Sequence, residues 1–252
     1  MISKHLKFIL LPYLSVAFAQ EVKWMSIGDL HNWYSAAGSE IEVGRTGQVS
    51  DQQDGLRYPA FYRVQDNQAA KGLWLGASNF YDPVVNKNYD KKVVHAGPRH
   101  LDIENETMPV SITMDGKYDH PNVFVDGDPA TNLQYLDYVD NVDPSLESDR
   151  KINNIVQTSL GVQMKRTIYA FAHPDHQNYH IQEYVFTNNG CFDKDCNTSY
   201  EQTLEGFQVY LQYRYAISRE GMVYDGNWLP QSAAWGHNSM NDVIGENPST
   251  PS

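Results

Sequence analysis

Cysteine is scarce in this chain of 252 residues, which holds only Cys191 and Cys196. Two cysteines cannot form a structural zinc site alone, and their spacing is not the C-x-x-C of redox sites. In an oxidising compartment such a pair most simply closes a small loop between two strands. The sequence therefore predicts a Cys191–Cys196 disulfide that acts as a local staple.

Basic residues are also few, with 19 Lys and Arg against 31 Asp and Glu, for a formal net charge of −12. A negative field of this size repels phosphate backbones and mainly keeps a protein soluble. We therefore expect no nucleic-acid partner for this acidic chain.

Long apolar runs are missing as well, apart from a short one near the N-terminus. It spans Phe8 to Phe18, follows a short basic segment and ends in the small-x-small pattern Ala17-Phe18-Ala19. These features are typical of a secretory signal peptide, and no later segment is long and apolar enough to be transmembrane. Residues 1–19 are therefore predicted to be a signal peptide, which makes the protein secreted or attached to the cell surface.

Catalytic and ligand motifs of high specificity are absent. The sequence contains no phosphate-binding loop, no G-x-S-x-G and no H-E-x-x-H. Glu183 lies among apolar neighbours in an expected strand, where a raised pKa would suit a glycosidase general acid. The alternative, which we favour, is that Glu183 pairs with Arg166 or Arg214 on a neighbouring strand. No catalytic residue is assigned.

Alternating side chains are the clearest pattern present. From Gly206 to Ile217 the apolar and aromatic residues occupy every second position, which indicates a strand with one face on a core. Those expected to be buried are Phe207, Val209, Leu211, Tyr213, Tyr215 and Ile217. A hairpin is predicted for two further segments, Met164 to Ala172 and Tyr179 to Thr187, joined by the polar turn His173 to Asn178. We expect these three strands to share one antiparallel sheet.

The wider pattern is one of short strands separated by turn signals, with 17 Tyr, 17 Gly and 12 Pro in the chain. It predicts a mainly β fold, an antiparallel β-sandwich with long loops and little helix. The sandwich is expected to form one domain over residues 20–245. Residues 246–252 are linker-like, and we interpret the chain as truncated before further modules.

An acidic stretch supplies a candidate metal site. Its aspartates are Asp126, Asp128, Asp137, Asp140 and Asp143. Carboxylate oxygens suit calcium, and extracellular calcium is often bound by loops of this composition. The spacing matches no EF-hand, and the alternative is a set of ordinary solvated loop acids. Calcium is the one cofactor that the sequence suggests.

Aromatic residues near the C-terminus supply a candidate ligand site. Tyr224, Trp228 and Trp235 lie in one loop-rich region, where flat rings could stack on sugars. The alternative is packing in the core or between the sheets, which absorbs most aromatic side chains in β-proteins. The first interpretation predicts glycan binding by these three residues.

Four segments of the sequence carry a resemblance. They are Tyr179 to Gly190, Leu204 to Tyr210, Met25 to Trp33 and Asn67 to Trp74. Together they resemble uncharacterised large secreted bacterial surface proteins with a β-sandwich region. Such proteins often continue into fibronectin-type modules and a sorting domain of the type IX secretion kind. The resemblance implies a surface role and carries over no catalytic residue.

Two functions are compatible with these observations. The favoured one is a secreted or cell-surface β-sandwich module with a non-catalytic binding or structural role, whose partner is glycan or a neighbouring protein domain. The alternative is the N-terminal domain of a secreted hydrolase acting on polysaccharide. A groove with two facing carboxylates, one of them Glu183, would favour the hydrolase.

Overall fold

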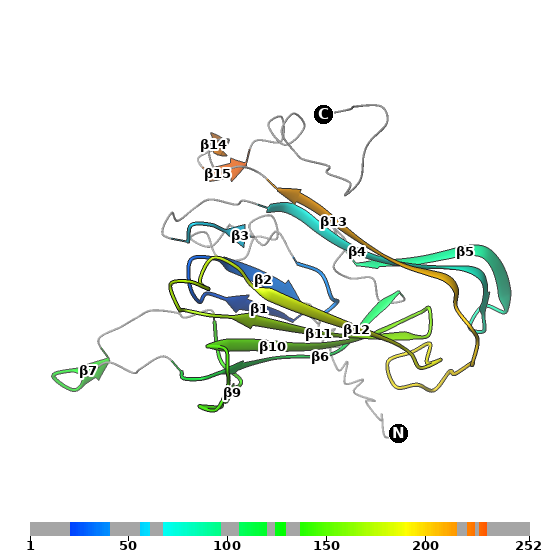
Figure 1. The fold of residues 1–252 in the computed structure, drawn as a ribbon, viewed down its shortest axis with the longest axis horizontal. Helices are drawn as coiled ribbons and strands as arrows, with labels where there is room; N and C mark the ends of the chain where they lie inside the picture. Colours follow the sequence, from blue (N-terminus) through cyan, green and yellow to red (C-terminus); the bar gives the residue numbers. More distant parts are fainter. Residues whose placement is uncertain are drawn as a thin grey trace, which may run out of the picture.

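The computed structural model describes residues 21–40, 56–60, 68–96, 106–119, 124–129, 137–215, 221–224 and 227–230. These residues form strands, turns and loops, and no helix occurs among them. Two antiparallel layers lie one above the other in Figure 1. The predicted mainly β, sandwich-like fold is therefore confirmed. The predicted signal peptide and the linker-like tail lie outside the described residues.

The larger layer is a five-stranded sheet in the order β12-β11-β10-β6-β9. Its strands are β6 (Thr107–Gly116), β9 (Asn141–Val142), β10 (Arg150–Thr158), β11 (Val162–Ala170) and β12 (Ile181–Asn188). All neighbours are antiparallel except β6 and β9. In the predicted hairpin, Met164 on β11 lies opposite Phe186 on β12, so that pairing is confirmed.

The smaller layer is a three-stranded sheet in the order β13-β4-β5. Its strands are β4 (Gln68–Asp82), β5 (Lys87–Ala96) and β13 (Glu205–Tyr215). The expectation that β13 shares a sheet with β11 and β12 is wrong. After β12 the chain crosses to the other layer, where β13 pairs with β4. Alternation fixes which side chains share a face, but not which strand lies alongside.

The expected burial of the β13 row is also only partly correct. Phe207 packs against the core, whereas Val209 and Leu211 are 41% and 36% exposed. Both pair with buried residues of β4, Leu75 and Leu73, so they lie on the core-facing side of the sheet. They remain exposed because β13 is an edge strand of its sheet.

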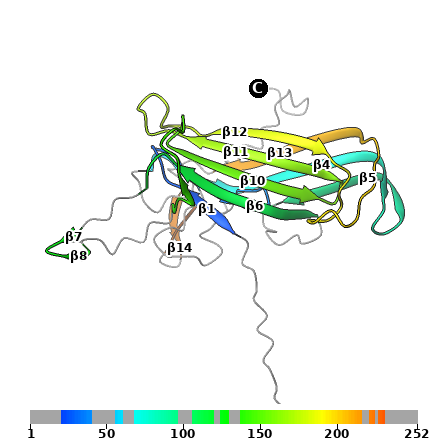
Figure 2. The same cartoon turned by 90° about the horizontal axis from the view of Figure 1, so that it is seen from below.

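A third small sheet, β1 (Val22–Met25), β2 (His31–Ser35) and β3 (Leu56–Arg57), lies against the large sheet. Two further hairpins are β7 (Phe124–Val125) with β8 (Asp128–Pro129), and β14 (Gly221–Tyr224) with β15 (Asn227–Pro230). Figure 2 shows the large sheet from below, with β12, β11, β10 and β6 in front and the smaller sheet behind them. The outer face of the large sheet is therefore on the open side of the sandwich.

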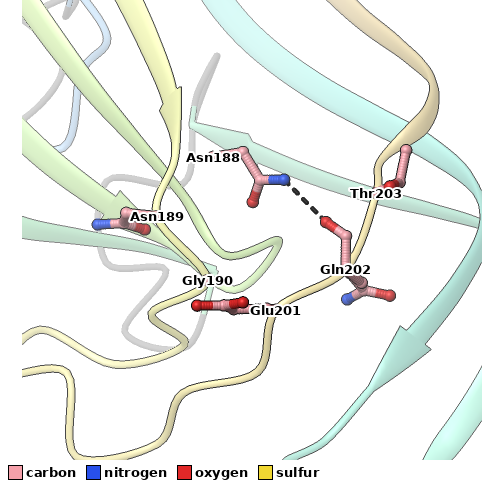
Figure 3. Close-up of a pocket in the computed structure, with 6 residues that line it drawn as sticks. All are labelled: Asn188, Asn189, Gly190, Glu201, Gln202 and Thr203. Carbon is pink, nitrogen blue, oxygen red and sulfur yellow. Dashed lines mark hydrogen bonds between the residues drawn. The ribbon is translucent and has the colours of Figure 1, made fainter.

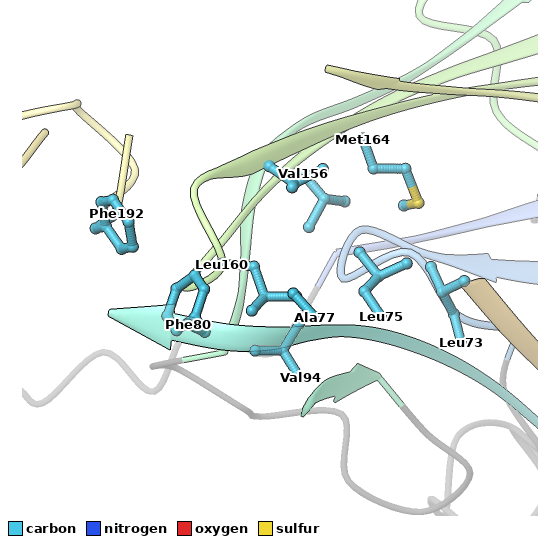
Figure 4. Close-up of a cluster of buried hydrophobic side chains, with 10 residues drawn as sticks. Leu73, Leu75, Ala77, Phe80, Val94, Val156, Leu160, Met164 and Phe192 are labelled. Atoms are coloured by element: carbon cyan, nitrogen blue, oxygen red, sulfur yellow. The ribbon is translucent and has the colours of Figure 1, made fainter. Parts of the chain in front are cut away.

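The first core cluster fills the space between the two main sheets. In Figure 4, Val156 and Met164 of the large sheet point toward Leu75 and Leu73 on β4. The buried members are Leu73, Leu75, Ala77, Phe80, Val94, Val156, Leu160, Val162, Met164 and Phe192. Each large apolar side chain buried in this way contributes about 1.5–3 kcal/mol. This cluster holds the layers together.

The second core cluster lies under the β1-β2 hairpin. Met25, Ile27 and Tyr34 of this region pack on Ile152 and other side chains of the large sheet. The remaining members are Ala36, Ile112, Met114, Ile168 and Ala170. The inner face of the large sheet is thus covered by two different partners, the small sheet at one end and the hairpin at the other.

A buried polar row separates the two clusters. Asn154 and Arg166 are opposite each other in the β10-β11 register, and both side chains are fully buried. The Arg166 guanidinium donates to Gly38 O at 2.9 Å, to Ser35 O at 2.9 Å and to Asn154 Oδ1 at 3.0 Å. It also lies over the Tyr34 ring, 5.5 Å from the centroid. Arg166 therefore fastens the turn after β2 to the large sheet.

The fastened turn also needs a glycine. Gly38 has φ of 96°, a conformation that favours glycine, and a Cβ there would lie 2.5 Å from the Met164 Cε. Asn154 holds the same turn from the sheet, because its Nδ2 donates to Ala36 O at 2.9 Å. Backbone carbonyls that would be orphaned in the interior are satisfied in this way.

Replacing Arg166 by lysine tests this fastening. A single ammonium cannot reproduce the planar fork that donates to four acceptors, so buried oxygens lose their donors. We expect Arg166→Lys to lower the free energy of unfolding by about 2–4 kcal/mol in urea titrations. Lys165→Met on the exposed face is the control and should change it by about 0.5 kcal/mol or less. Equal stability of both variants would contradict this role of Arg166.

Candidate functional site

An aromatic row crosses the outer face of the small sheet. Trp74 on β4 pairs with Tyr210 on β13 and with His95 on β5, so the three side chains lie side by side. The Trp74 ring centroid is 5.9 Å from that of Tyr210 and 5.7 Å from that of His95. Trp74 is 37% exposed and Tyr210 is 50% exposed. Alternation places these rings outward because Leu73 and Leu75 point inward.

A carboxylate steadies one end of this aromatic row. Glu106 Oε2 lies 2.8 Å from His95 Nδ1 and accepts the His95 backbone N–H at 3.0 Å. The His95 Nε2, the Trp74 indole N–H and the Tyr210 hydroxyl make no hydrogen bond to any residue that the structure describes. The row therefore offers ring faces together with polar atoms that have no partner within the described part of the chain.

A glycine widens the surface next to the aromatic row. Gly76 occupies the next outward position on β4, between Val93 and Gln208 on the flanking strands. A Cβ at Gly76 would make only ordinary contacts, the nearest at 3.6 Å, so packing does not require glycine there. The missing side chain leaves the surface low beside the Trp74 ring.

A pocket of about 480 Å³ lies at one end of the outer face of the large sheet. Tyr169, Phe171 and Ile181 provide aromatic and aliphatic surface, and the segment from Asp143 to Ser148 borders them. Lys151 completes the lining. This pocket is separate from the aromatic row, which lies on the other sheet.

A second, polar pocket of about 450 Å³ lies beside the disulfide loop. Figure 3 shows Asn188 to Gly190, at the end of β12, facing Glu201 to Thr203 on the segment that leads into β13. The Asn188 amide donates to Gln202 O at 2.8 Å and ties the two segments together. The shape of this pocket therefore depends on how the chain crosses from β12 to β13.

The predicted disulfide between Cys191 and Cys196 is confirmed, with Cα atoms 4.8 Å apart. Asp193 organises the loop that it closes, because its carboxylate accepts the backbone N–H groups of Asn197 and Thr198 at 3.0 and 2.6 Å. These hydrogen bonds lower the pKa of Asp193. The staple shapes the crossing from β12 to β13 and leaves no thiol free.

The five predicted calcium ligands have separate surroundings. Asp126 and Asp128 are exposed on the β7-β8 hairpin, whereas Asp137 is buried. Asp140 accepts from Lys23 Nζ at 2.9 Å, and Asp143 accepts from the Ser145 hydroxyl at 2.6 Å. Within the described ranges, no three His, Cys, Asp or Glu side chains are grouped so as to hold a metal ion. The structure does not bring these aspartates together.

The structure describes the strands of two of the three residues of the predicted sugar platform. Tyr224 on β14 pairs with Asn227, and Trp228 on β15 pairs with Val223, so both follow β13 in a short hairpin. Trp235 lies outside the described residues. The aromatic row was missed by the sequence reasoning because Trp74, His95 and Tyr210 belong to three separate segments.

Glu183 is exposed on the outer face of the large sheet, opposite Thr167 on β11. Its suggested partner Arg166 points to the buried face, which rules out that ion pair. Glu183 lines neither of the two pockets described above.

Among the described residues, His31 has the largest downward pKa shift, to about 4, caused first by burial and then by the Arg57 charge. Its ring stands edge-on to Trp24 at 5.7 Å, and Nε2 donates to Gly28 O at 3.1 Å. Arg57 in turn lies 5.4 Å from the Trp24 ring centroid. Groups with perturbed pKa values often mark active sites. Here the surroundings are those of a core, because Trp24 and Trp33 are buried.

The fold and these surfaces define a mainly β sandwich protein with an exposed aromatic row and two pockets. No protein family, curated protein or solved structure matches this chain. Among the described residues, there is no helix with the length and apolar character needed to cross a membrane.

The shifted pKa of His31 predicts a loss of stability in acid. In the unfolded chain His31 takes up a proton near its ordinary pKa of 6.5, but the folded protein resists protonation until about pH 4. Stability should therefore fall by up to about 3 kcal/mol as the pH drops through this window. Urea titrations of His31→Gln should lack this contribution. His173→Gln, at an exposed histidine, is the control and should keep it.

Proposed function

We propose that this protein is a secreted or cell-surface β-sandwich module that binds glycan without catalysing a reaction on it. The exposed aromatic row on the small sheet carries the proposal. Sugar rings have apolar C–H faces, which pack on Trp and Tyr rings, and hydroxyls, which pair with nearby polar atoms. Trp74, Tyr210 and His95 offer both kinds of contact at one surface.

The tilt of the rings supports a single glycan chain as ligand. Trp74 makes interplanar angles of 62° with His95 and 65° with Tyr210. Rings at such angles cannot all lie against one flat face, as a crystalline polysaccharide would require. A soluble chain can follow the tilt from one sugar unit to the next.

Export is part of the same proposal. The leader-like residues 1–19 and the Cys191–Cys196 disulfide both suit an oxidising compartment outside the cytosol. The exposed position of Glu183, outside both pockets, supports a binding module over a polysaccharide hydrolase. An extracellular glycan is the partner that the aromatic row fits.

Replacing Trp74 tests the proposal. Wild-type protein should be retarded in native gels that contain a soluble polysaccharide from a panel of glucans, mannans and xylans. Trp74→Ala should weaken that affinity about tenfold, which corresponds to about 1.4 kcal/mol of lost stacking. The fold should persist, because the ring is exposed and contributes little to the core.

Tyr138→Ala is the matched control, since Tyr138 is 61% exposed and lies away from the aromatic row. It should bind like the wild type. If both variants are retarded as much as the wild type, the glycan binds elsewhere on the protein. If the wild type is not retarded by any polysaccharide of the panel, the proposed function is overturned.

A further inference from the structure

The pocket at the end of the large sheet is built on one row of the strand register. Ile181, Tyr169 and Lys151 lie opposite one another on β12, β11 and β10, and Asp115 on β6 continues the row. Ile181 is 47% exposed. Phe171 and Leu146 add further apolar surface to the lining. The floor is therefore suited to an apolar stem, such as the methylene chain of a long side chain.

The charges around this floor are not balanced. Lys151 is the one cation in the lining; its Nζ is 3.5 Å from Asp115 Oδ2, and its charge also helps to lower the pKa of Asp143. The lining carboxylates are Asp143 and Glu147, and neither forms an ion pair within the part of the chain that the structure describes. The pocket thus combines an apolar floor with a negative rim.

The Asp143 side of the rim is held by hydrogen bonds of the loop itself. Asp143 Oδ1 accepts from the Ser145 amide at 2.9 Å and from its hydroxyl at 2.6 Å, and these hydrogen bonds lower the pKa of Asp143. At the other end of the loop, Asp149 Oδ2 accepts the Ala172 N–H at 2.6 Å. A carboxylate that is already fixed, as Asp143 is, loses little conformational entropy on binding.

We propose that this pocket binds a lysine or arginine side chain of a partner protein. The alkyl stem lies on Ile181 and Phe171, and the cation is placed over the Tyr169 ring and between Asp143 and Glu147. A glutamate or a phosphate is repelled by the same two carboxylates. The inference is independent of glycan binding, because the aromatic row belongs to the other sheet.

Amide chemical shifts of the whole chain can test this pocket with matched ligands. The probe is N-acetyl-lysine methylamide, and the control is N-acetyl-norleucine methylamide, which has a similar stem without the ammonium. We expect saturable shifts of the amides of residues 143–148 and of Tyr169 with the lysine compound. The norleucine compound should bind at least about threefold more weakly.

Charge-removing variants separate the pocket from the general acidity of the protein. Glu147→Gln should weaken lysine binding about two- to fivefold, and the double variant Asp143→Asn, Glu147→Gln should weaken it about tenfold. The side-chain amide oxygen that Asp143→Asn introduces can still accept from Ser145, so the turn is retained. Glu183→Gln removes the same charge from the same sheet face outside the pocket and should leave the affinity unchanged.

Three results would overturn the inference. They are equal binding of the lysine and norleucine compounds, an equal effect of Glu147→Gln and Glu183→Gln, and shifts that leave the pocket amides unmoved at saturating ligand. Shifts of the pocket amides by a neutral oligosaccharide alone would assign the pocket to glycan instead. Each of these outcomes leaves the Trp74 result for the aromatic row unaffected.

Discussion

The guanidinium of Arg166 is the interaction on which the placement of the N-terminal hairpin depends. It lies on the inner face of the large sheet, between the two apolar clusters, and donates to carbonyls of a turn that belongs to the β1-β2 region. A buried cation is costly unless hydrogen bonds compensate its lost hydration, so the conformation of the turn that supplies these acceptors is favoured. Arg166 thereby sets where the N-terminal hairpin sits and how the inner face is divided.

That division determines which surfaces remain for ligands. The inner face of the large sheet is covered by the small sheet and the hairpin, so binding must use the outer faces or the ends of the strands. The aromatic row is on the outer face of the small sheet, and the pocket beside Tyr169 is on the outer face of the large one. Because these faces point in opposite directions, both sites can be occupied at the same time (Figure 1).

Local sequence patterns correctly predicted the features whose parts are close together in the sequence. The β11-β12 hairpin follows from two alternating segments joined by a polar turn, and the disulfide follows from two cysteines five residues apart. The pairing of β13 with β4 could not be read in this way, since more than a hundred residues separate the two strands. Alternation is a property of each strand alone and carries no information on a distant partner.

The sequence by itself determined the mainly β class, the local staple and the acidic character, because these follow from composition and from period-two patterns. Only the tertiary structure decided which strands lie side by side, and therefore which side chains meet. The strand register brings Trp74, His95 and Tyr210 together on one surface. Arg166 is buried and hydrogen-bonded because a turn distant in the sequence packs over it. Long-range pairing brings these groups together, and its free energy is a sum over the whole core rather than a property of any short segment.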